Sequence, residues 1–256
     1  MSDQPGTALV TGATAGLGRA FTEQLAERGH DLVLVARNAE RLDDVAREVR
    51  AAHRVAVEVI TADLADRAQL RAVEDRVRDT GRPLTVLVNN AGFGLKERFL
   101  DNDVEAETEM LDVLVTAVMR LTHAGLGAMR ETGGGRILNV SSVAGFLPRG
   151  TYGAAKTYVT QLSRWANAEY APSGVTVTAV CPGFVRTEFH QRMDVDQGSA
   201  PGGMWLDAST VVREALADLD AGKALSVPSV RYRAISAAAR IVPMPLLQRL
   251  QSLGRG

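Results

Sequence analysis

The sequence predicts one α/β domain with a doubly wound parallel sheet and helices on both of its faces. Its 256 residues are enough for a large single core. Short β-branched runs alternate with longer helical patterns, as in a parallel sheet joined by right-handed crossovers. The short runs are apolar almost throughout, which is typical of strands buried on both faces. No linker, repeat or low-complexity tract interrupts this order, so residues 1–256 are expected to form a single domain.

Each element follows from a local pattern. The expected strands are 7–11, 31–36, 55–60, 85–88, 136–140, 175–180 and 224–227. The expected helices are 17–28, 39–52, 67–78, 104–130, 152–170 and 209–219, with a helical tail near 231–253. Three consecutive glycines, 133–135, end the longest helix. The segment 188–206 has several large apolar residues and no regular pattern, so we expect a lid over a binding site there. The alternative is that residues 204–206 only anchor the next helix.

The composition excludes several classes of protein. A formal net charge of -1 gives no electrostatic case for binding nucleic acid or an anionic membrane. Cys181 is the only cysteine and the four histidines lack metal-ligand spacing, so we expect no internal disulfide and no metal site. No apolar run approaches the ~20 residues of a membrane span. Residues 1–7 are too short and polar for a signal peptide, so we expect a cytoplasmic protein.

A glycine-rich turn, TGATAGLG at 11–18, joins the first strand to the first helix. Gly12, Gly16 and Gly18 allow positive φ angles and a close approach of the backbone to a phosphate. The free N–H groups at the start of the helix would face the same phosphate. A purely structural turn is the alternative, but the position after the first strand favours a pyrophosphate site.

Polar residues follow three other expected strands. Arg37 comes after the second strand, where an acid would bind the ribose of NAD and an arginine accommodates the 2′-phosphate of NADP. A solvated arginine is the alternative. Asp63, after the third strand, is placed to reach an adenine amino group, to cap the next helix, or both. The sequence NNAG at 89–92 follows the fourth strand, at the edge where open sheets bind ligands.

The most specific pair is Tyr152 and Lys156, which lie four residues apart on one helical face. A phenol with a pKa near ~10 is a weak acid–base catalyst. A lysine cation at ~4 Å would lower that pKa by roughly three units, toward neutral pH. Ser142, after the fifth strand, offers a hydroxyl to a carbonyl oxygen. A surface pair and a turn-capping serine are the alternatives, but lysine occurs at only three positions in the chain.

Together these motifs resemble the short-chain dehydrogenase/reductase family. TGATAGLG is similar to its TG-x3-G-x-G turn, NNAG to its fourth-strand motif, Ser…YxxxK to its catalytic set, and CPGFVRT at 181–187 to its PG-x3-T segment. The resemblance spans about residues 7–227 and implies that Tyr152 is the acid–base, that Lys156 binds the nicotinamide ribose and lowers the Tyr152 pKa, and that Ser142 orients the carbonyl. It places Asp63 and Leu64 at the adenine, Asn90 at the adenosine ribose, and Val185 and Thr187 at the nicotinamide. The full set of implied cofactor contacts is Gly12, Thr14, Ala15, Gly16, Leu17, Gly18, Arg37, Asp63, Leu64, Asn90, Ala91, Gly92, Tyr152, Lys156, Pro182, Gly183, Val185 and Thr187.

Three features depart from the family pattern. The segment between Ser142 and Tyr152 is a few residues shorter than in many members. Ala15 stands where members that prefer NADP often carry a second basic residue, so an NADP preference rests on Arg37, with Arg41 as a weaker helper. Leu114 stands where the family usually has an asparagine that fixes a water between the catalytic lysine and solvent. Leucine has no group that does this.

The sequence therefore predicts an oxidoreductase that transfers a hydride between NADP(H) and a carbonyl or secondary alcohol, with an apolar small molecule as its substrate. The alternatives are the same chemistry with NAD(H), or a nucleotide-binding sensor or scaffold with little turnover, which only Leu114 favours. The resemblance implies a homodimer or homotetramer paired through helices 104–130 and 152–170. The second helix offers Tyr158, Leu162, Trp165 and Ala166 to such an interface. The C-terminal tail is expected to pack on the domain or a second subunit, with a membrane surface as the alternative.

Overall fold

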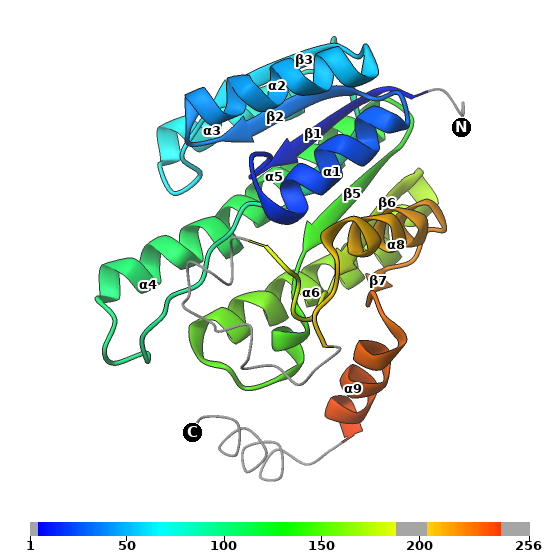
Figure 1. The fold of residues 1–256 in the computed structure, drawn as a ribbon. Coiled ribbons are helices and arrows are strands. Elements are labelled where there is room, and N and C mark those ends of the chain that lie inside the picture. Colours follow the sequence, from blue (N-terminus) through cyan, green and yellow to red (C-terminus); the bar gives the residue numbers. More distant parts are fainter. Residues whose placement is uncertain (1–4, 188–203, 242–256) are drawn as a thin grey trace.

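The computed structural model describes residues 5–187 and 204–241, and within them the strands form one seven-stranded parallel sheet (Figure 1). The strand order is β3-β2-β1-β4-β5-β6-β7. The strands are β1 (Thr7–Thr11), β2 (Asp31–Ala36), β3 (Val57–Thr61), β4 (Leu84–Asn89), β5 (Gly135–Val140), β6 (Val175–Val180) and β7 (Leu225–Ser226). The order reverses between β1 and β4, which is where doubly wound sheets bind ligands. The predicted fold class is confirmed.

Helices cover both faces of the sheet. They are α1 (Gly16–Glu27), α2 (Ala39–His53), α3 (Arg67–Arg78), α4 (Val104–Leu111), α5 (Val118–Glu131), α6 (Gly150–Tyr170), α8 (Ala208–Asp220) and α9 (Val230–Ile241). Three shorter segments complete the list: η1 (Asp112–Ala117), η2 (Val143–Phe146) and η3 (Ala171–Ser173). The side chains of α1, α2 and α8 form one core cluster with the sheet, and those of α3, α5 and α6 form a second on the opposite face. Figure 1 shows α1 and α8 in front of the sheet and α5 behind it.

The predicted helix over 104–130 is correct in extent but not uniform. The segment η1 between α4 and α5 is a π-helix, in which the hydrogen bonds span one residue more than in an α-helix. Leu114 lies in this segment and is 1% exposed. Sequence periodicity does not reveal such a local widening, because the apolar pattern continues through it. The π turn brings Leu114 toward the start of α6, where Tyr152 lies.

The long helical stretch over 104–131 packs against the sheet and contributes to the core of the domain. By length and composition alone it is apolar enough to cross a membrane. Its most apolar window is 56% buried within the domain, and α5 packs against α3, α6 and β4. The apolar pattern of this helix predicts a core position for His123, but the residue is exposed, while its neighbours Thr122 and Ala124 are buried.

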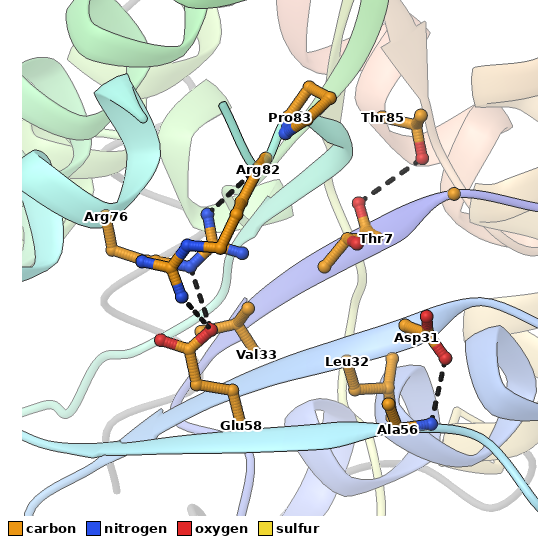
Figure 2. A pocket seen from close by; sticks show the side chains of 11 residues that line it. Thr7, Asp31, Leu32, Val33, Ala56, Glu58, Arg76, Arg82, Pro83 and Thr85 are labelled. Carbon is orange, nitrogen blue, oxygen red and sulfur yellow. Dashed lines mark hydrogen bonds and ion pairs between the residues drawn. The ribbon is translucent and has the colours of Figure 1, made fainter. Parts of the chain in front are cut away.

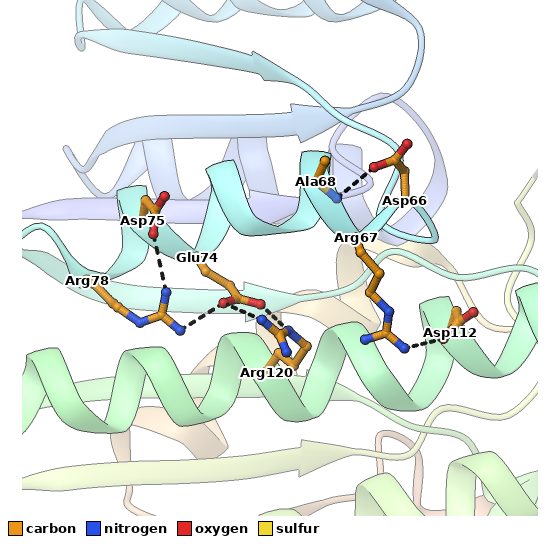
Figure 3. A network of polar contacts seen from close by, with 8 residues as sticks. All are labelled: Asp66, Arg67, Ala68, Glu74, Asp75, Arg78, Asp112 and Arg120. Atoms are coloured by element: carbon orange, nitrogen blue, oxygen red, sulfur yellow. Dashed lines mark hydrogen bonds and ion pairs between the residues drawn. The ribbon is translucent and has the colours of Figure 1, made fainter.

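A buried carboxylate ties α3 to α5 (Figure 3). Glu74 on α3 has a side chain only 1% exposed, and it accepts hydrogen bonds from Arg120 of α5 at 2.9 Å and from Arg78 at 2.8 Å. A second pair, Arg67 with Asp112 at 2.9 Å, joins the start of α3 to η1. Burial alone would raise the pKa of Glu74, but the two arginines outweigh it and leave that pKa below its usual value.

Two of the predicted segments lie partly outside the described residues. Of the expected lid over 188–206, only residues 204–206 are described, and there Leu206 donates a backbone hydrogen bond to Phe184 at 2.8 Å. Of the tail near 231–253, residues up to 241 form α9, and Tyr232 is buried against the domain. The described part of the tail thus packs on its own domain, which is one of the placements expected from the sequence.

Candidate active site

The glycine turn has the geometry of an anion site. Gly12 and Gly16 have φ angles of 66° and 53°, in the left-handed region that favours glycine. A Cβ on Gly18 would lie 2.0 Å from the Gly12 carbonyl oxygen, so only glycine fits where the turn meets the helix. Helix α1 begins at Gly16, and its N-cap, Ala15, offers no side chain to the first N–H groups. These N–H groups are therefore available to a phosphate. Thr14 and Leu17 lie in the same turn.

The second asparagine of NNAG holds this turn in place. Asn90 donates through Nδ2 to the carbonyl of Thr11 at 2.8 Å, and the Thr11 hydroxyl accepts from the backbone N–H groups of Asn90 and Ala91 at 2.9 and 3.0 Å. A Cβ on Gly12 would lie 3.0 Å from the Asn90 amide. The predicted ribose contact of Asn90 remains a prediction. Its side-chain amide already braces the loop that would hold the phosphates.

The other predicted adenosine contacts lie at the ends of β2 and β3. Arg37 is largely exposed and has Asp63 and Glu109 each at 3.8 Å from its Nη1 atom. Asp63 accepts from the N–H of Ala65 at 3.0 Å, and the N-cap of α3 is Asp66, so the helix-cap role considered for Asp63 is wrong. Leu64 is 6% exposed within the core, which leaves mainly its backbone for a ligand.

Ser142 and Tyr152 meet at the carboxyl edge of the sheet. Ser142 is the N-cap of η2, where its Oγ accepts from the N–H of Ala144 at 3.1 Å, and it is also hydrogen-bonded to the Tyr152 side chain. The neighbouring serine is committed elsewhere, because the buried Ser141 hydroxyl is 2.7 Å from both the Lys156 carbonyl and the Thr160 hydroxyl. Of the two serines, Ser142 is therefore the one whose hydroxyl lies at the Tyr152 side chain.

Lys156 lies beneath Tyr152 and is 5% exposed. Its Nζ donates to the Val140 carbonyl at 2.8 Å and lies 5.6 Å from the centre of the Tyr152 ring. Burial lowers the pKa of Lys156 to about 8 and raises the pKa of Tyr152 to about 12. The groups that lower the Tyr152 pKa are Ser142 and Arg149. The expected lowering by Lys156 toward neutral pH is therefore not seen, because desolvation of the phenol dominates.

Leu114 forms an apolar wall beside this pair. It packs in a cluster with Met110 and Ala155, which Phe93 and Tyr152 join from its edge. A Cβ at Gly92 would lie 2.7 Å from the Leu114 Cδ2 atom, so a larger residue at the end of NNAG would require this leucine to shift. The place that the family gives to a polar amide is thus filled by hydrocarbon, and the Val140 carbonyl is the described hydrogen-bond partner of the Lys156 ammonium.

The segment after β6 closes the site from the other side. The carbonyl of Pro182 accepts from the N–H of Val143 at 3.0 Å, which joins this segment to the residue that follows Ser142. Thr187 lies against the glycine turn, since a Cβ on Gly16 would be 3.1 Å from its Cβ and Cγ2. Val185 is buried and pairs as an isolated bridge with Leu206. Motifs that lie far apart in the sequence therefore meet at one edge.

At the opposite, amino edge of the sheet lies a hollow of about 420 Å³ (Figure 2). Arg76 donates to Glu58 at 2.9 Å and to the Arg82 carbonyl at 2.9 Å there. The predicted catalytic residues Ser142, Tyr152 and Lys156 are not among its lining residues. Its arginines are already paired with Glu58, so this hollow adds nothing to the site at the carboxyl edge.

Sequence reasoning missed several residues that shape the site. Glu109 reaches Arg37 from α4, and the Val140 carbonyl holds Lys156. The side chain of Tyr232 on α9 covers Gly183. Glu109 cannot be recognised in the sequence as a neighbour of Arg37, because the two residues belong to distant segments of the chain. A backbone carbonyl and a distant tyrosine leave no sequence pattern at all.

The comparisons with known proteins agree with this geometry. A family model described as short chain dehydrogenase matches residues 6–198. The very-long-chain 3-oxoacyl-CoA reductase of Anas platyrhynchos is 37% identical over 190 residues, covering 71% of this chain but only 60% of that relative. A short-chain dehydrogenase from Sphingobium yanoikuyae in complex with NADPH has 37% identity and a TM-score of 0.84, over 92% of this chain and 94% of the other. The bulky-bulky ketone specific alcohol dehydrogenase from Comamonas testosteroni has 32% identity and a TM-score of 0.81, over 93% of each chain.

A doubly wound sheet with a glycine turn at its switch point and a Ser–Tyr–Lys set beside it defines a dinucleotide-dependent oxidoreductase. The chain belongs to the short-chain dehydrogenase/reductase family, as the sequence resemblance implied. Members of this family use a nicotinamide cofactor.

Proposed function

We propose that this protein reduces a small, apolar ketone or aldehyde with NADPH, and runs the reverse oxidation of a secondary alcohol. The observation that carries this proposal is the grouping of Ser142, Tyr152 and Lys156 at the edge that also holds the glycine turn. The similarity to an NADPH-bound dehydrogenase and to a ketone-specific alcohol dehydrogenase supports the same class of reaction. The apolar residues around Tyr152, among them Phe93 and Leu95, suit a substrate with hydrocarbon substituents.

In this mechanism the residues of the chain hold the carbonyl and deliver one proton. A nicotinamide, when bound, supplies or accepts the hydride at the carbonyl carbon. Ser142 donates a hydrogen bond to the carbonyl oxygen, and Tyr152 gives that oxygen its proton. The Tyr152 pKa of about 12 keeps the phenol protonated at neutral pH, which is the state that reduction needs. Lys156, with a pKa of about 8, holds a proton nearby that it can return to the phenolate.

The choice of NADP(H) rests on Arg37, whose guanidinium can form two parallel bonds to a 2′-phosphate. The arrangement of Asp63 and Glu109 at 3.8 Å from this guanidinium favours the second candidate, NAD(H), because both carboxylates repel a phosphate and offset the arginine charge. These opposed effects make the cofactor preference a direct test of which charge dominates.

Calorimetric titration with NADPH and with NADH measures that preference. We expect NADPH to bind at least about tenfold tighter, since a charge-assisted pair contributes about 1.5–3 kcal/mol. Arg37→Ala removes most of the preference, whereas Glu109→Gln strengthens it by removing a competing carboxylate and leaves NADH affinity unchanged. Equal affinities for both cofactors in the wild-type protein would show that NADP(H) is the wrong assignment. An NADPH preference that survives Arg37→Ala would show that Arg37 is not the source of the preference.

A further inference from the structure

The side chain of Tyr232 packs against the segment that follows β6. Tyr232 belongs to α9, which lies beyond the residues that match the family model. Tyr232 is 3% exposed. Its ring lies directly over Gly183, where a Cβ would fall 1.9 Å from the Tyr232 Cζ atom. The ring therefore occupies the space that a side chain at position 183 would need, and only glycine permits this contact.

The hydroxyl of Tyr232 joins two backbone segments. It accepts a hydrogen bond from the N–H of Phe184 at 3.1 Å and donates one to the carbonyl of Met204 at 2.9 Å. The same two segments also bond directly, because Leu206 donates to the Phe184 carbonyl at 2.8 Å and Arg186 donates to the Leu206 carbonyl at 3.0 Å. Phe184 and Trp205 add an aromatic contact with ring centres 5.4 Å apart. The phenol of Tyr232 thus adds two hydrogen bonds to a junction that otherwise consists of backbone hydrogen bonds and one aromatic contact.

The direction in which α9 runs toward this junction is fixed by the residue just before the helix. Ser229, just before α9, has a φ of 83°, which is rare for a residue other than glycine. Its N–H donates to the Glu214 carboxylate of α8 at 3.2 Å. A left-handed serine persists only where its surroundings hold it. The direction of α9, and with it the position of Tyr232, is therefore set by the body of the domain.

We propose that Tyr232 is a positioning residue for the nicotinamide end of the cofactor. It fixes residues 183 and 184, and the chain continues from there to Val185 and to Thr187, which lies against Gly16 of the phosphate turn. Without the hydroxyl, the N–H of Phe184 and the carbonyl of Met204 each lose a buried partner, so the segment gains freedom that cofactor binding must then remove. This inference rests on the assignment of residues 182–187 to the cofactor.

The variant Tyr232→Phe keeps the ring over Gly183 and removes both hydrogen bonds. Tyr170→Phe is the matched control, since Tyr170 lies at the far end of α6 and makes ring contacts with Trp165 and Arg130. Hydrogen exchange of the peptide covering 182–187 and calorimetric titration with NADPH are measured on both folded variants and on the wild-type protein. We expect faster exchange of the Phe184 amide and an NADPH dissociation constant raised about three- to tenfold in Tyr232→Phe alone.

Exchange and affinity that match the Tyr170→Phe control would overturn the inference. Faster exchange with an unchanged NADPH dissociation constant would overturn it as well, since the segment would then move without consequence for the cofactor. A wild-type protein that binds neither NADPH nor NADH would instead contradict the proposed function, and the role of Tyr232 would be lost with it. The wild-type titration thus separates the two failures.

Discussion

At the scale of single residues, the unusual feature is an apolar wall beside a buried acid–base pair. Leu114 packs against Gly92 and Tyr152, while the Lys156 ammonium is held by the Val140 carbonyl. Hydrocarbon on this side gives no polar atom to relay a proton from solvent to Lys156. The proton that Lys156 returns to Tyr152 in each turnover is therefore replaced through the substrate cleft, and this replacement is slower than it would be through a polar path.

Leu114→Asn tests this interpretation directly. An amide at this position can order a water beside Lys156, so we expect ketone reduction to speed up by up to about tenfold at neutral pH, a fraction of a typical acid–base contribution. Burying the amide costs about 1–3 kcal/mol of stability, which thermal unfolding will show. The pH dependence of the rate is measured on both proteins. A folded variant with the wild-type rate and pH profile would mean that another group already completes the relay.

The buried ammonium of Lys156 also predicts how stability changes with pH. Its pKa is about 8 in the folded protein, against an ordinary value of 10.5. Between these values the unfolded chain binds more protons than the folded one, so the penalty for burying the charge is full below pH 8 and fades as the pH rises toward 10.5.

Comparison of the wild-type protein with Lys156→Met isolates this effect. The difference in unfolding free energy, wild type minus variant, is expected to grow in favour of the wild type by about 2 kcal/mol between pH ~7 and ~9.5, at about 1.4 kcal/mol per pH unit. Chemical denaturation at several pH values provides the measurement. A difference that stays constant over this range would show that the ammonium is solvated, contrary to its burial in the structure.

At the scale of elements, the contact between α3 and α5 depends on one buried carboxylate. Glu74 is 1% exposed and has two arginine partners, so removing one of them leaves a buried charge half compensated. Arg120→Ala is expected to lower the free energy of unfolding by about 2–3 kcal/mol. Removing Arg120 should lower the free energy of unfolding more than removing Arg78, because the Arg78 side chain is 46% exposed and that of Arg120 is 35% exposed.

The matched control is therefore Arg78→Ala, which should cost about 1 kcal/mol or less. Denaturant titration of both variants near pH 7 gives the comparison. Because the two arginines hold the Glu74 pKa below its usual value, this contribution is present at neutral pH and is lost as acid protonates the carboxylate. An Arg120→Ala variant as stable as Arg78→Ala would contradict the assignment of the buried charge to this pair.

The elements also show how far sequence reasoning reaches. The limits of β1, β2, β6 and α3 agree with the predicted ranges, because each is an apolar or amphipathic run with a turn residue at its end. The turn TGATAGLG could be placed at the switch point, since glycine spacing reports local backbone geometry. The π turn at η1 and the hydrogen bond between Lys156 and Val140 could not be predicted from the sequence. Both depend on packing between segments that are distant in the sequence.

At the scale of the whole molecule, several large apolar side chains of α5 and α6 are exposed. Trp165 and Tyr158 on α6 are 54% and 38% exposed, and Met119 on α5 is 40% exposed. Ala166, expected at the same surface, is instead in the core. We propose that the exposed residues of α5 and α6 pair with a second copy of the chain, because tryptophan, tyrosine and methionine are enriched at the buried centres of protein interfaces.

Trp165→Glu is expected to reduce the native mass to that of a smaller assembly, because a carboxylate in a paired apolar face has no partner. Leu100→Glu is the control, since Leu100 is 90% exposed in the loop before α4. Size-exclusion chromatography with light scattering gives the masses of both variants and of the wild-type protein. If Trp165→Glu keeps the wild-type mass, α6 is not an interface.

The central claim is that Tyr152 gives its proton to a carbonyl oxygen held by Ser142 while NADPH supplies the hydride. The most direct measurement is the oxidation of NADPH by the purified protein over a panel of ketones and aldehydes, repeated with Tyr152→Phe. We expect the wild-type protein to turn over at least one apolar carbonyl. We expect turnover to fall about 10²–10⁴-fold in Tyr152→Phe, because the proton donor is removed. NADPH affinity should be nearly unchanged, because the hydroxyl makes little contact with the cofactor. Near-normal turnover in Tyr152→Phe would show that Tyr152 is not the proton donor.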